Sequence, residues 1–429
     1  ALTLDSSQNA SFAGDVNLAD SKKLQLGAGQ DLEIYHDGSN SYVTNATGDF
    51  LISSTGDDVQ IIAADDVLIK TQANENAIWA VGNAGVKLYY DNELKFETTS
   101  GGITVTGAVN GIPFFSDAAN NSMYTHDVSA TDSTAANNTA YGFNALDAIT
   151  TGDNNTVIGA VSGGAMTTGS NNTALGYQSG EDLVDGVQNT FVGAGAGKNM
   201  TAGDNNVAIG FEALATEDGN GRNIAIGVSA LKLQNAGAEA YNVAIGFTAG
   251  ESITLGIANT LIGGLAGDAI NEGNQNVAIG HAALSTNQEG DSNVAIGFEA
   301  LYTLNPADGN SYNTAVGTQA GKLMTTAVKN TIIGASAGDA ITEGGFNVAI
   351  GYDAFSANTV GNSNIAIGTA ALATNVAADR NVAIGTDALT AMTSATTADT
   401  YNTAVGYNAG AAVTSGTANT LIGGLAGDA

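Results

Sequence analysis

The chain contains no cysteine, 2 prolines, 3 histidines and only 11 basic side chains. The absence of cysteine excludes a disulfide framework and thiolate metal sites, and so few histidines disfavour most zinc centres. Against the basic residues stand 42 acidic ones, for a formal net charge of −31. Nucleic acids and polybasic membrane contacts need clustered Lys and Arg, so we expect no nucleic-acid partner. No apolar run is long enough to span a bilayer, and we expect no membrane insertion.

What the chain has in abundance is glycine, 57 of 429 residues, beside 43% hydrophobic residues. From residue 138 onward a five-residue signature recurs: Asn, then Thr, Val or Ile, a mostly small apolar residue, an aliphatic residue and Gly. Its period along the chain is 17, with longer steps of 19, 20 and 21 before Asn242, Asn313 and Asn402. Each longer step has a Tyr directly before its Asn. The seventeen signature asparagines are Asn138, Asn155, Asn172, Asn189, Asn206, Asn223, Asn242, Asn259, Asn276, Asn293, Asn313, Asn330, Asn347, Asn364, Asn381, Asn402 and Asn419.

Each signature predicts a short β-strand that ends at a turn glycine. Side chains alternate along a strand, so the second and fourth places share one face and the third takes the other. The fourth place is aliphatic in all copies but the first, and the third is Ala in twelve of seventeen. We therefore expect a strand that is buried on both faces. Ala or Ser three residues after each Gly, followed by Gly, Leu or Phe, indicates a second short strand in the repeat.

A 17-residue unit cannot bury a core alone, but stacked copies can. The sequence therefore predicts an all-β fold whose residues 138–429 form a parallel β-solenoid of seventeen coils, the last one cut short. Stacking places each signature Asn above the next, and we expect their side-chain amides to hydrogen-bond as a ladder along the axis. Because the chain starts at Ala1 and ends within a copy, at 419–429, we also expect it to be part of a longer protein.

The small third place leaves two arrangements open. Either the large residues fill the lumen of the coil and Ala faces outward, or Ala faces inward and the aliphatic residues face outward. Both leave an apolar stripe along the rod, and an exposed stripe of this kind indicates an interface. We therefore expect a homo-oligomer. In the first arrangement, the bulky third-place residues Val157, Phe191, Leu261, Ile332 and Leu421 would mark places where a shared axis widens.

The units NNTALGYQSG, NVAIGFEAL, NIAIGTAAL and NTAVGYNAG resemble the head repeats of trimeric autotransporter adhesins of the YadA type. The resemblance covers residues 138–429 and implies a threefold-symmetric, left-handed parallel β-roll, hence a homotrimer. The repeat of this chain is longer than is usual in that family. Similar repeats also occur in the fibre proteins of tailed phages.

Residues 1–137 alternate apolar and polar side chains in short runs such as KKLQLG, DFLISS, DVQIIAADDVLI and GVKLYYDNELKFETT, which predicts short strands and tight turns. The stretches DLEIYHDGSNSYVTNATGDFLISS and VKLYYDNELKFETTSGGITVTG resemble shaft segments of marine phage tail fibres. We accordingly expect a strand-rich shaft over residues 1–110 and a connector over 111–137. The resemblance implies a structural, adhesive virion protein, a tail fibre or spike. Its expected partners are other tail or baseplate proteins and a host cell-surface glycan or protein receptor.

Motifs of the common enzyme classes are absent, and we expect no catalysis and no cofactor. Gly193–Gly197 superficially resembles a phosphate loop but lies where the repeat places glycine anyway. His36 is expected at a hairpin tip, His126 and Asp127 in the connector, and His281 in a place that holds an aromatic residue in neighbouring coils. The pairs Asp57–Asp58 and Asp65–Asp66 could form a paired-carboxylate site but read better as solvated turns.

Two weaker signals remain. Asp153, Asp204 and Asp218 gather with Asn in the loops before the strands, where they could bind calcium or serve only as turn residues. The place after the signature Gly often holds an aromatic residue, which could stack on sugars or pack on the next coil. These aromatic residues are Phe143, Tyr177, Phe211, Phe247, Phe298, Tyr352 and Tyr407.

Three other functions compete with the phage fibre. The first is the head of a bacterial trimeric adhesin, which would lie on a cell surface. The second is a β-helical polysaccharide depolymerase. The third is an ice-binding solenoid, disfavoured because Thr fills the second place in only about half of the copies. The sequence leaves open the receptor, the host, the location of the binding tip, the handedness of the coil and the direction of the chain relative to the virion.

Overall fold

The computed structural model is all-β and falls into two units, Ala1–Thr106 and Gly107–Ala429. It describes residues 2–4, 10–56, 58–71, 75–82, 84–100, 102–106, 108–109, 112–113, 115–117, 122–124, 134–219, 221–307, 309–394 and 396–429. The division at residue 106 lies close to the end of the predicted shaft region.

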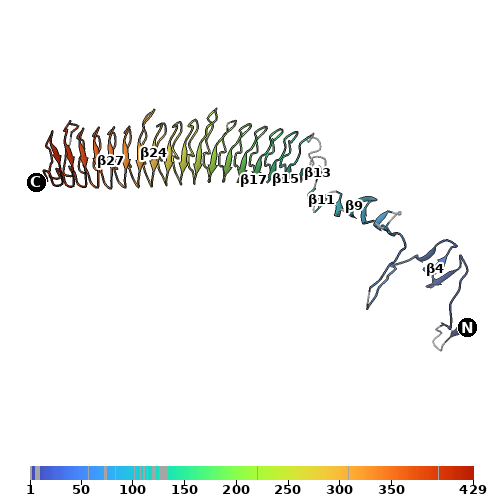
Figure 1. Ribbon diagram of the computed structural model, residues 1–429. Helices are drawn as coiled ribbons and strands as arrows, with labels where there is room; N and C mark the ends of the chain where they lie inside the picture. Colours follow the sequence, from blue (N-terminus) through green and yellow to red (C-terminus); the bar gives the residue numbers. More distant parts are fainter. Residues whose placement is uncertain are drawn as a thin grey trace. The chain divides into compact units, whose positions relative to one another are not determined.

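The first unit consists of small antiparallel sheets, as the alternating runs predicted (Figure 1). Strands that follow one another in the chain pair with each other, so each sheet follows the order of the chain. The sheets are β1 (Leu2–Leu4) with β2 (Ala10–Phe12); β3 (Lys23–Leu26), β4 (Leu32–His36) and β5 (Ser41–Asn45); and β6 (Val67–Lys70), β7 (Asn76–Ala80), β8 (Val86–Tyr90), β9 (Glu93–Thr99) and β10 (Gly102–Val105).

The segment between β5 and β6 departs from the prediction. The runs DFLISS and DVQIIAADD were expected to be strands, but the described residues of 46–66 contain none. Leu51 and Ile62 are 83% and 87% exposed. A strand needs a neighbouring strand to pair with along its edge, and no strand of the described residues pairs with this segment. The alternating pattern therefore predicts strand-forming residues correctly in type, but no neighbouring strand of the described residues pairs with them.

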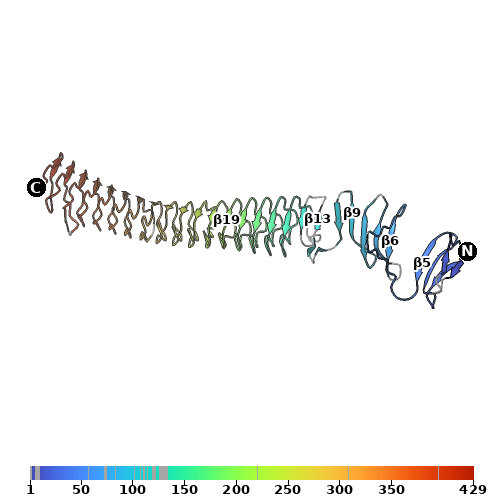
Figure 2. The same cartoon turned by 90° about the horizontal axis from the view of Figure 1, so that it is seen from below.

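The second unit is a parallel β-solenoid, which confirms the predicted fold (Figures 1 and 2). Two short hairpin strands, β11 (Ala108–Val109) and β12 (Ile112–Pro113), come before it. Then β13 (Phe115–Asp117) pairs antiparallel with β14, and from β14 to β31 every strand pairs parallel with the next, so the stack begins within the predicted connector. These strands are β14 (Ser122–Tyr124), β15 (Thr139–Tyr141), β16 (Thr156–Ile158), β17 (Thr173–Leu175), β18 (Thr190–Val192), β19 (Val207–Ile209), β20 (Ile224–Ile226), β21 (Val243–Ile245), β22 (Thr260–Ile262), β23 (Val277–Ile279), β24 (Val294–Ile296), β25 (Thr314–Val316), β26 (Thr331–Ile333), β27 (Val348–Ile350), β28 (Ile365–Ile367), β29 (Val382–Ile384), β30 (Thr403–Val405) and β31 (Thr420–Ile422).

Each coil contains one strand, and the predicted second strand is wrong. Counting places from the signature Asn, the strand fills the second to fourth places and Gly the fifth. The seventh and ninth places and the residue before the next Asn adopt left-handed backbone, as at Ala282 (φ 54), Leu284 (φ 55) and Ser292 (φ 59). These residues turn the chain where a strand was expected. Left-handed backbone costs roughly 1–2 kcal/mol per non-glycine residue, so the coil depends on its neighbours for stability.

The fifth-place glycine meets two requirements at once. Gly280 has φ 132, a conformation that L side chains rarely adopt. A Cβ atom added to it would lie 2.5 Å from the carbonyl oxygen of Gly297 in the next coil. The turn and the close stacking of successive coils both therefore require glycine here.

The third-place side chains point into the lumen, so the second of the two open arrangements holds. Ala278 and Ala295 are fully buried, whereas Val277 and Ile279 on the other face are half-buried. The expectation that both faces of the strand are buried is wrong for the single chain, because nothing in it covers the outward face.

Bulky third-place residues are accommodated inside the coil, so the expectation that they mark a widening shared axis is also wrong. Each is matched by Gly at the ninth place of the same coil, where many Ala-containing coils have Leu. In one such coil, a Cβ atom on Gly197 would lie 2.5 Å from a ring carbon of Phe191. Close packing of the lumen thus conserves volume across two places. The pairs are Val157 with Gly163, Phe191 with Gly197, Leu261 with Gly267, Ile332 with Gly338 and Leu421 with Gly427.

This pairing predicts coupling between the two places. We expect Leu261→Ala to lower the free energy of unfolding by about 2–5 kcal/mol through cavity formation. Gly267→Leu alone should cost about 1–3 kcal/mol through overpacking. The double variant should lose much less than the sum, because Leu284 already fills the same place above Ala278 in the next coil. Chemical denaturation of the three variants measures this, and strictly additive losses would contradict the pairing.

Candidate functional site

The signature asparagines form a buried column along the solenoid. The backbone N–H of Asn276 donates to Oδ1 of Asn259 at 3.0 Å, and its Nδ2 donates to the same oxygen at 3.2 Å. Nδ2 also donates across the coil to the carbonyl oxygen of Gly290 at 2.9 Å. The backbone N–H to Oδ1 bond joins every successive pair from Asn138 to Asn419, including the pairs that span the longer coils.

This geometry accounts for the choice of Asn. The side chain must accept from the backbone of the next coil and donate to a carbonyl of its own coil, at full burial. Aspartate lacks the donor, and the hydroxyl of Ser or Thr is too short to reach both partners. A buried polar group left without a partner costs about 1–3 kcal/mol, so an Asn such as Asn276 stabilises its own coil and the following one. Asn223 is an exception, because its buried Nδ2 has no hydrogen-bond partner among the described residues.

In several coils an Asp or Asn two residues before the signature Asn bonds in the opposite direction, and sequence reasoning missed this role. Oδ1 of Asp153 accepts from the backbone N–H of Ala136 at 2.8 Å, and Oδ1 of Asp204 accepts from Val187 at 2.7 Å. Asn274, Asp291, Asn362 and Asp379 make the same contact with the preceding coil. The loop carboxylates considered for calcium thus include groups that satisfy backbone donors. Among the described residues, no group of three or more His, Asp or Glu side chains is arranged to hold a metal ion.

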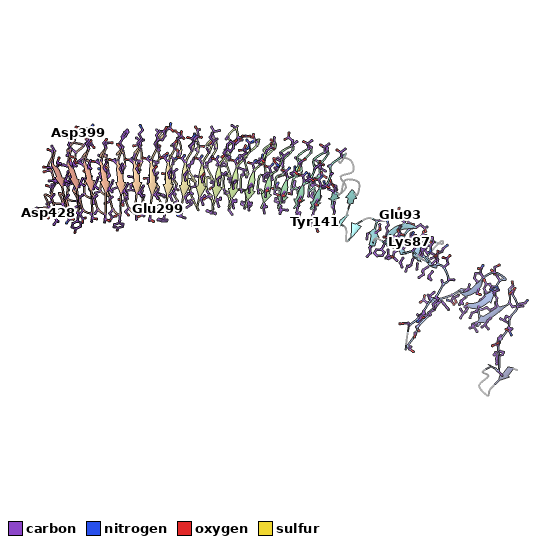
Figure 3. The ribbon with its side chains drawn as sticks, in the orientation of Figure 1. Lys87, Glu93, Tyr141, Glu299, Asp399 and Asp428 are labelled. Atoms are coloured by element: carbon purple, nitrogen blue, oxygen red, sulfur yellow. The ribbon has the colours of Figure 1, made fainter. Side chains whose placement is uncertain are left out.

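The sixth-place aromatic residues lie exposed in a row along the solenoid. Phe143 is 75% exposed, Tyr177 57%, Phe211 52%, and Phe247 60%. Phe298, Tyr352 and Tyr407 are also exposed, and the ring of His281 stacks on that of Phe298 at 5.8 Å. Figure 3 labels Glu299, the neighbour of Phe298, at one edge of the solenoid and Asp399 at the opposite edge. The row therefore offers ring surface that the coils of the single chain leave open.

Two of the three longer coils are closed by an arginine contact, or latch, that explains their tyrosines, Tyr241 and Tyr401. Both arginines of the chain occupy the place before a signature Asn, directly below a longer coil. Arg222 forms an ion pair with Glu239, lies over the ring of Tyr241 at 5.5 Å and donates to its hydroxyl at 3.0 Å. Arg380 repeats the arrangement with Asp399 and Tyr401.

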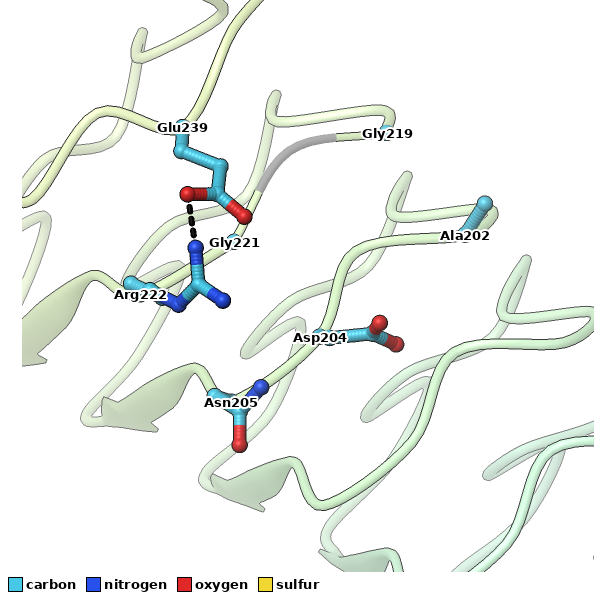
Figure 4. Close-up of a pocket in the computed structure, with 7 residues that line it drawn as sticks. All are labelled: Ala202, Asp204, Asn205, Gly219, Gly221, Arg222 and Glu239. Carbon is cyan, nitrogen blue, oxygen red and sulfur yellow. Dashed lines mark ion pairs between the residues drawn. The ribbon is translucent and has the colours of Figure 1, made fainter.

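The first latch borders a small cavity of about 110 Å³ (Figure 4). Asp204, Asn205 and the glycines Gly219 and Gly221 complete its lining with Ala202. The Arg222 guanidinium faces the Glu239 carboxylate, and Oδ1 of Asp204 already accepts a backbone hydrogen bond. The two charged side chains thus pair with each other and Asp204 is bonded to the backbone, so we assign the cavity a structural role.

The other residues considered for chemistry are accounted for locally. His36 lies at the end of β4 and contacts the Ser41 hydroxyl at 3.2 Å across the β4–β5 hairpin. Backbone donation from Asn40 and Ser39 lowers the pKa of Asp37 in the turn. Asp66 accepts from Gly82 N and Trp79 Nε1, which lowers its pKa.

Gly195 and Gly197 adopt the left-handed backbone that recurs at the seventh and ninth places of the coils. Asp57, His126 and Asp127 lie outside the described residues.

Comparison with protein families, with curated proteins and with solved structures found no match to this chain. The described part of the chain contains no helix that is long and apolar enough to cross a membrane.

The asparagine column predicts a large effect from a single buried amide. We expect Asn276→Ala to lower the melting temperature by several degrees, because it removes the hydrogen bonds donated by Nδ2 and leaves the N–H of Asn293 without its partner. Gln275→Ala, at the neighbouring surface place where Ala258 and Ala418 already occur, is the matched control. Equal melting of the two variants in a thermal scan would refute the assigned role.

One carboxylate predicts a pH dependence. Burial, and next the nearby Asp353, raise the pKa of half-buried Asp339. A raised folded-state pKa means that the charged form opposes folding, so stability is lost as pH rises through that pKa. We expect Asp339→Asn to raise the melting temperature at pH 7, with a gain that shrinks on acidification. Exposed Asp185→Asn is the control, and a gain that does not vary with pH would contradict this assignment.

Proposed function

We propose that this chain is a rod-like structural and adhesive protein, a homotrimeric tail fibre or spike of a tailed phage that holds a receptor-binding element away from the virion. The observation that carries the proposal is the outward strand face. Fourth-place aliphatic side chains repeat there in coil after coil, joined by Val or Ile at the second place in about half of the coils, and Ile158, Ile262, Ile333 and Ile384 are 36–42% exposed. An uncovered apolar stripe of this length marks an interface.

A second copy of the same stripe is the partner that fits best. Straight, repetitive faces pair in register with copies of themselves, and oligomers of one chain are usually closed and symmetric. Covering the remaining exposed part of one aliphatic side chain contributes about 0.5–1 kcal/mol. One such place in nearly every coil and a second in about half of them therefore supply on the order of ten kcal/mol or more along the solenoid, before the entropic cost of association is subtracted.

The first unit supports association as well. Its exposed segment, residues 46–66, carries strand-type alternation without a strand partner in the described chain. The threefold number and the phage assignment come from the resemblance of the repeats to trimeric adhesin heads and of residues 1–110 to fibre shafts. Within the virion, tail or baseplate proteins would hold one part of the fibre, and a host glycan or protein receptor would bind it.

The mechanism in this proposal is mechanical. Three solenoids would lie parallel around a common threefold axis and bury their aliphatic faces against one another. The asparagine column of each chain would fix the rise of its coils. Such a rod transmits position and force over its length without moving parts. No bond-making chemistry is assigned to it.

Native mass measurement of the full chain tests the proposal. We expect a mass near three times 42.6 kDa. The outward-face variant Ile279→Glu with Ile296→Glu should shift it toward 42.6 kDa, because it places charges in the apolar interface. Leu323→Glu, at an exposed apolar residue outside the strands, is the matched control and should leave the mass unchanged. A wild-type chain that is monomeric at micromolar concentration would overturn the proposal.

A further inference from the structure

The aromatic row has a period that differs from that of the coils. Over the first nine coils, an aromatic ring fills the sixth place of every second coil: Phe143, Tyr177, Phe211, Phe247 and His281. The coils between them carry Ala160, Ala194, Val228 and Gly264 at the same place. With strands ~4.8 Å apart, rings in alternate coils lie ~10 Å apart along one edge.

This period matches one kind of ligand. In an extended β-linked polysaccharide, successive sugar rings are turned over, so the same face recurs at every second sugar. That repeat has nearly the length of two stacked coils. The apolar C–H face of a sugar packs on an aromatic ring, whose π face carries partial negative charge. A chain laid along the solenoid could therefore place every second sugar on a ring, with a small residue beneath each intervening sugar.

A polar cavity lies on the same coils that carry the first two rings of the row, Phe143 and Tyr177. It has a volume of about 220 Å³ and spans three coils, between Asn144 and Asp147 at one end and Glu181 and Asp182 at the other. Val161, Gly164 and Ala165 line it in the middle coil, which carries no sixth-place ring. Asn144 directly follows Phe143 in the chain, and the Glu181 carboxylate accepts from Gln178 next to Tyr177 at 2.7 Å.

The lining of this cavity selects the charge of the ligand. Carboxylate and amide oxygens accept hydrogen bonds from sugar hydroxyls, and convergent polar groups beside apolar surface are typical of ligand sites. The same carboxylates, in a chain of net charge −31, repel acidic sugars.

We propose that the edge of the first coils, from Phe143 to Phe247, binds a neutral, extended β-linked polysaccharide that lies parallel to the solenoid axis. The inference rests on the proposed function, for which it names the chemical class of the receptor. It requires the aromatic edge to stay accessible when the outward strand face is covered.

Binding of cellohexaose to the full chain, measured by calorimetry, tests the inference. Maltohexaose is the matched control ligand, because its α-linked chain of the same sugar curves away from a straight row. We expect cellohexaose to bind and maltohexaose not to bind. Absence of cellohexaose binding would overturn the proposal. Equal binding of cellohexaose and maltohexaose would also overturn it, because it would show that the spacing of the aromatic rings does not determine which sugar binds.

Protein variants separate spacing from mere aromatic content. We expect Tyr177→Ala to weaken cellohexaose binding about fivefold. Tyr177→Ala with Ala194→Tyr keeps the composition but moves the ring by one coil, and it should bind as weakly as the single variant. Tyr312→Ala, at an exposed tyrosine outside the row, should bind like the wild type. Wild-type affinity in the moved-ring variant, or equal loss in Tyr312→Ala, would refute the match of periods.

Native mass and sugar binding together distinguish failure of the polysaccharide site from failure of the proposed trimeric fibre. A trimeric chain that binds no cellohexaose refutes only the polysaccharide site. A monomeric chain that discriminates between the two sugars refutes the trimeric fibre and leaves the site standing.

Discussion

The solenoid depends on the satisfaction of backbone polar groups at each turn. A coil with one three-residue strand turns through several left-handed residues, and the backbone of its own and the next coil pairs with only part of its remaining N–H and C=O groups. The signature Asn supplies the missing partners, accepting from the coil above and donating to its own. The Asp and Asn residues two places earlier do the reverse, toward the coil below. Junctions with Asp or Asn at that place are therefore bonded from both sides, and the others rely on the signature Asn and on backbone pairing between coils.

Packing of the lumen follows from the same stacking. Since the strand spacing is fixed, the volume within each coil is nearly constant, and a large side chain at one place requires a small one opposite. Phe191 between Gly180 and Gly197 shows this most directly. At the polar edges, side-chain contacts also join adjacent coils, as in the ion pair of Lys232 with Glu212. Every stabilising contact of the solenoid links near neighbours along the axis.

The fold was predictable because its constraint acts on residue type. Asn at a regular period, a strand-forming triplet and a turn Gly are all visible in the sequence, and they led directly to the parallel solenoid. The sequence left open whether the third-place side chain points into the lumen or outward, since Ala and Ile are both apolar. The pairing of a bulky third-place residue with a ninth-place glycine, as in Leu261 with Gly267, follows from its position inside the lumen. The second strand was wrongly predicted because the recurring pair of Ala or Ser with Gly, Leu or Phe was taken for a strand, whereas residues such as Leu284 adopt left-handed backbone there. The strands expected within residues 46–66 failed for another reason, because a pattern of side chains does not provide an edge to pair with.

The candidate site was predictable only in part. The aromatic residues were evident, but the alternate-coil period matters only once the coils are stacked at a constant rise. The role of Asp153 and Asp204 toward the preceding coil could have been found from their fixed offset from Asn. The latch of Arg222 with Tyr241 required the structure, since the two residues are brought together by the height of one coil rather than by any sequence motif.

The longer coils carry one more consequence. Asn223 and Asn242, 19 residues apart, are joined by the same backbone bond as pairs 17 residues apart. The added residues go to one edge and leave the axial rise unchanged. Length and surface are thus independent variables of this architecture. The length of the solenoid changes in steps of one whole coil. The loop at the edge of any coil can be lengthened or substituted without moving the next coil along the axis.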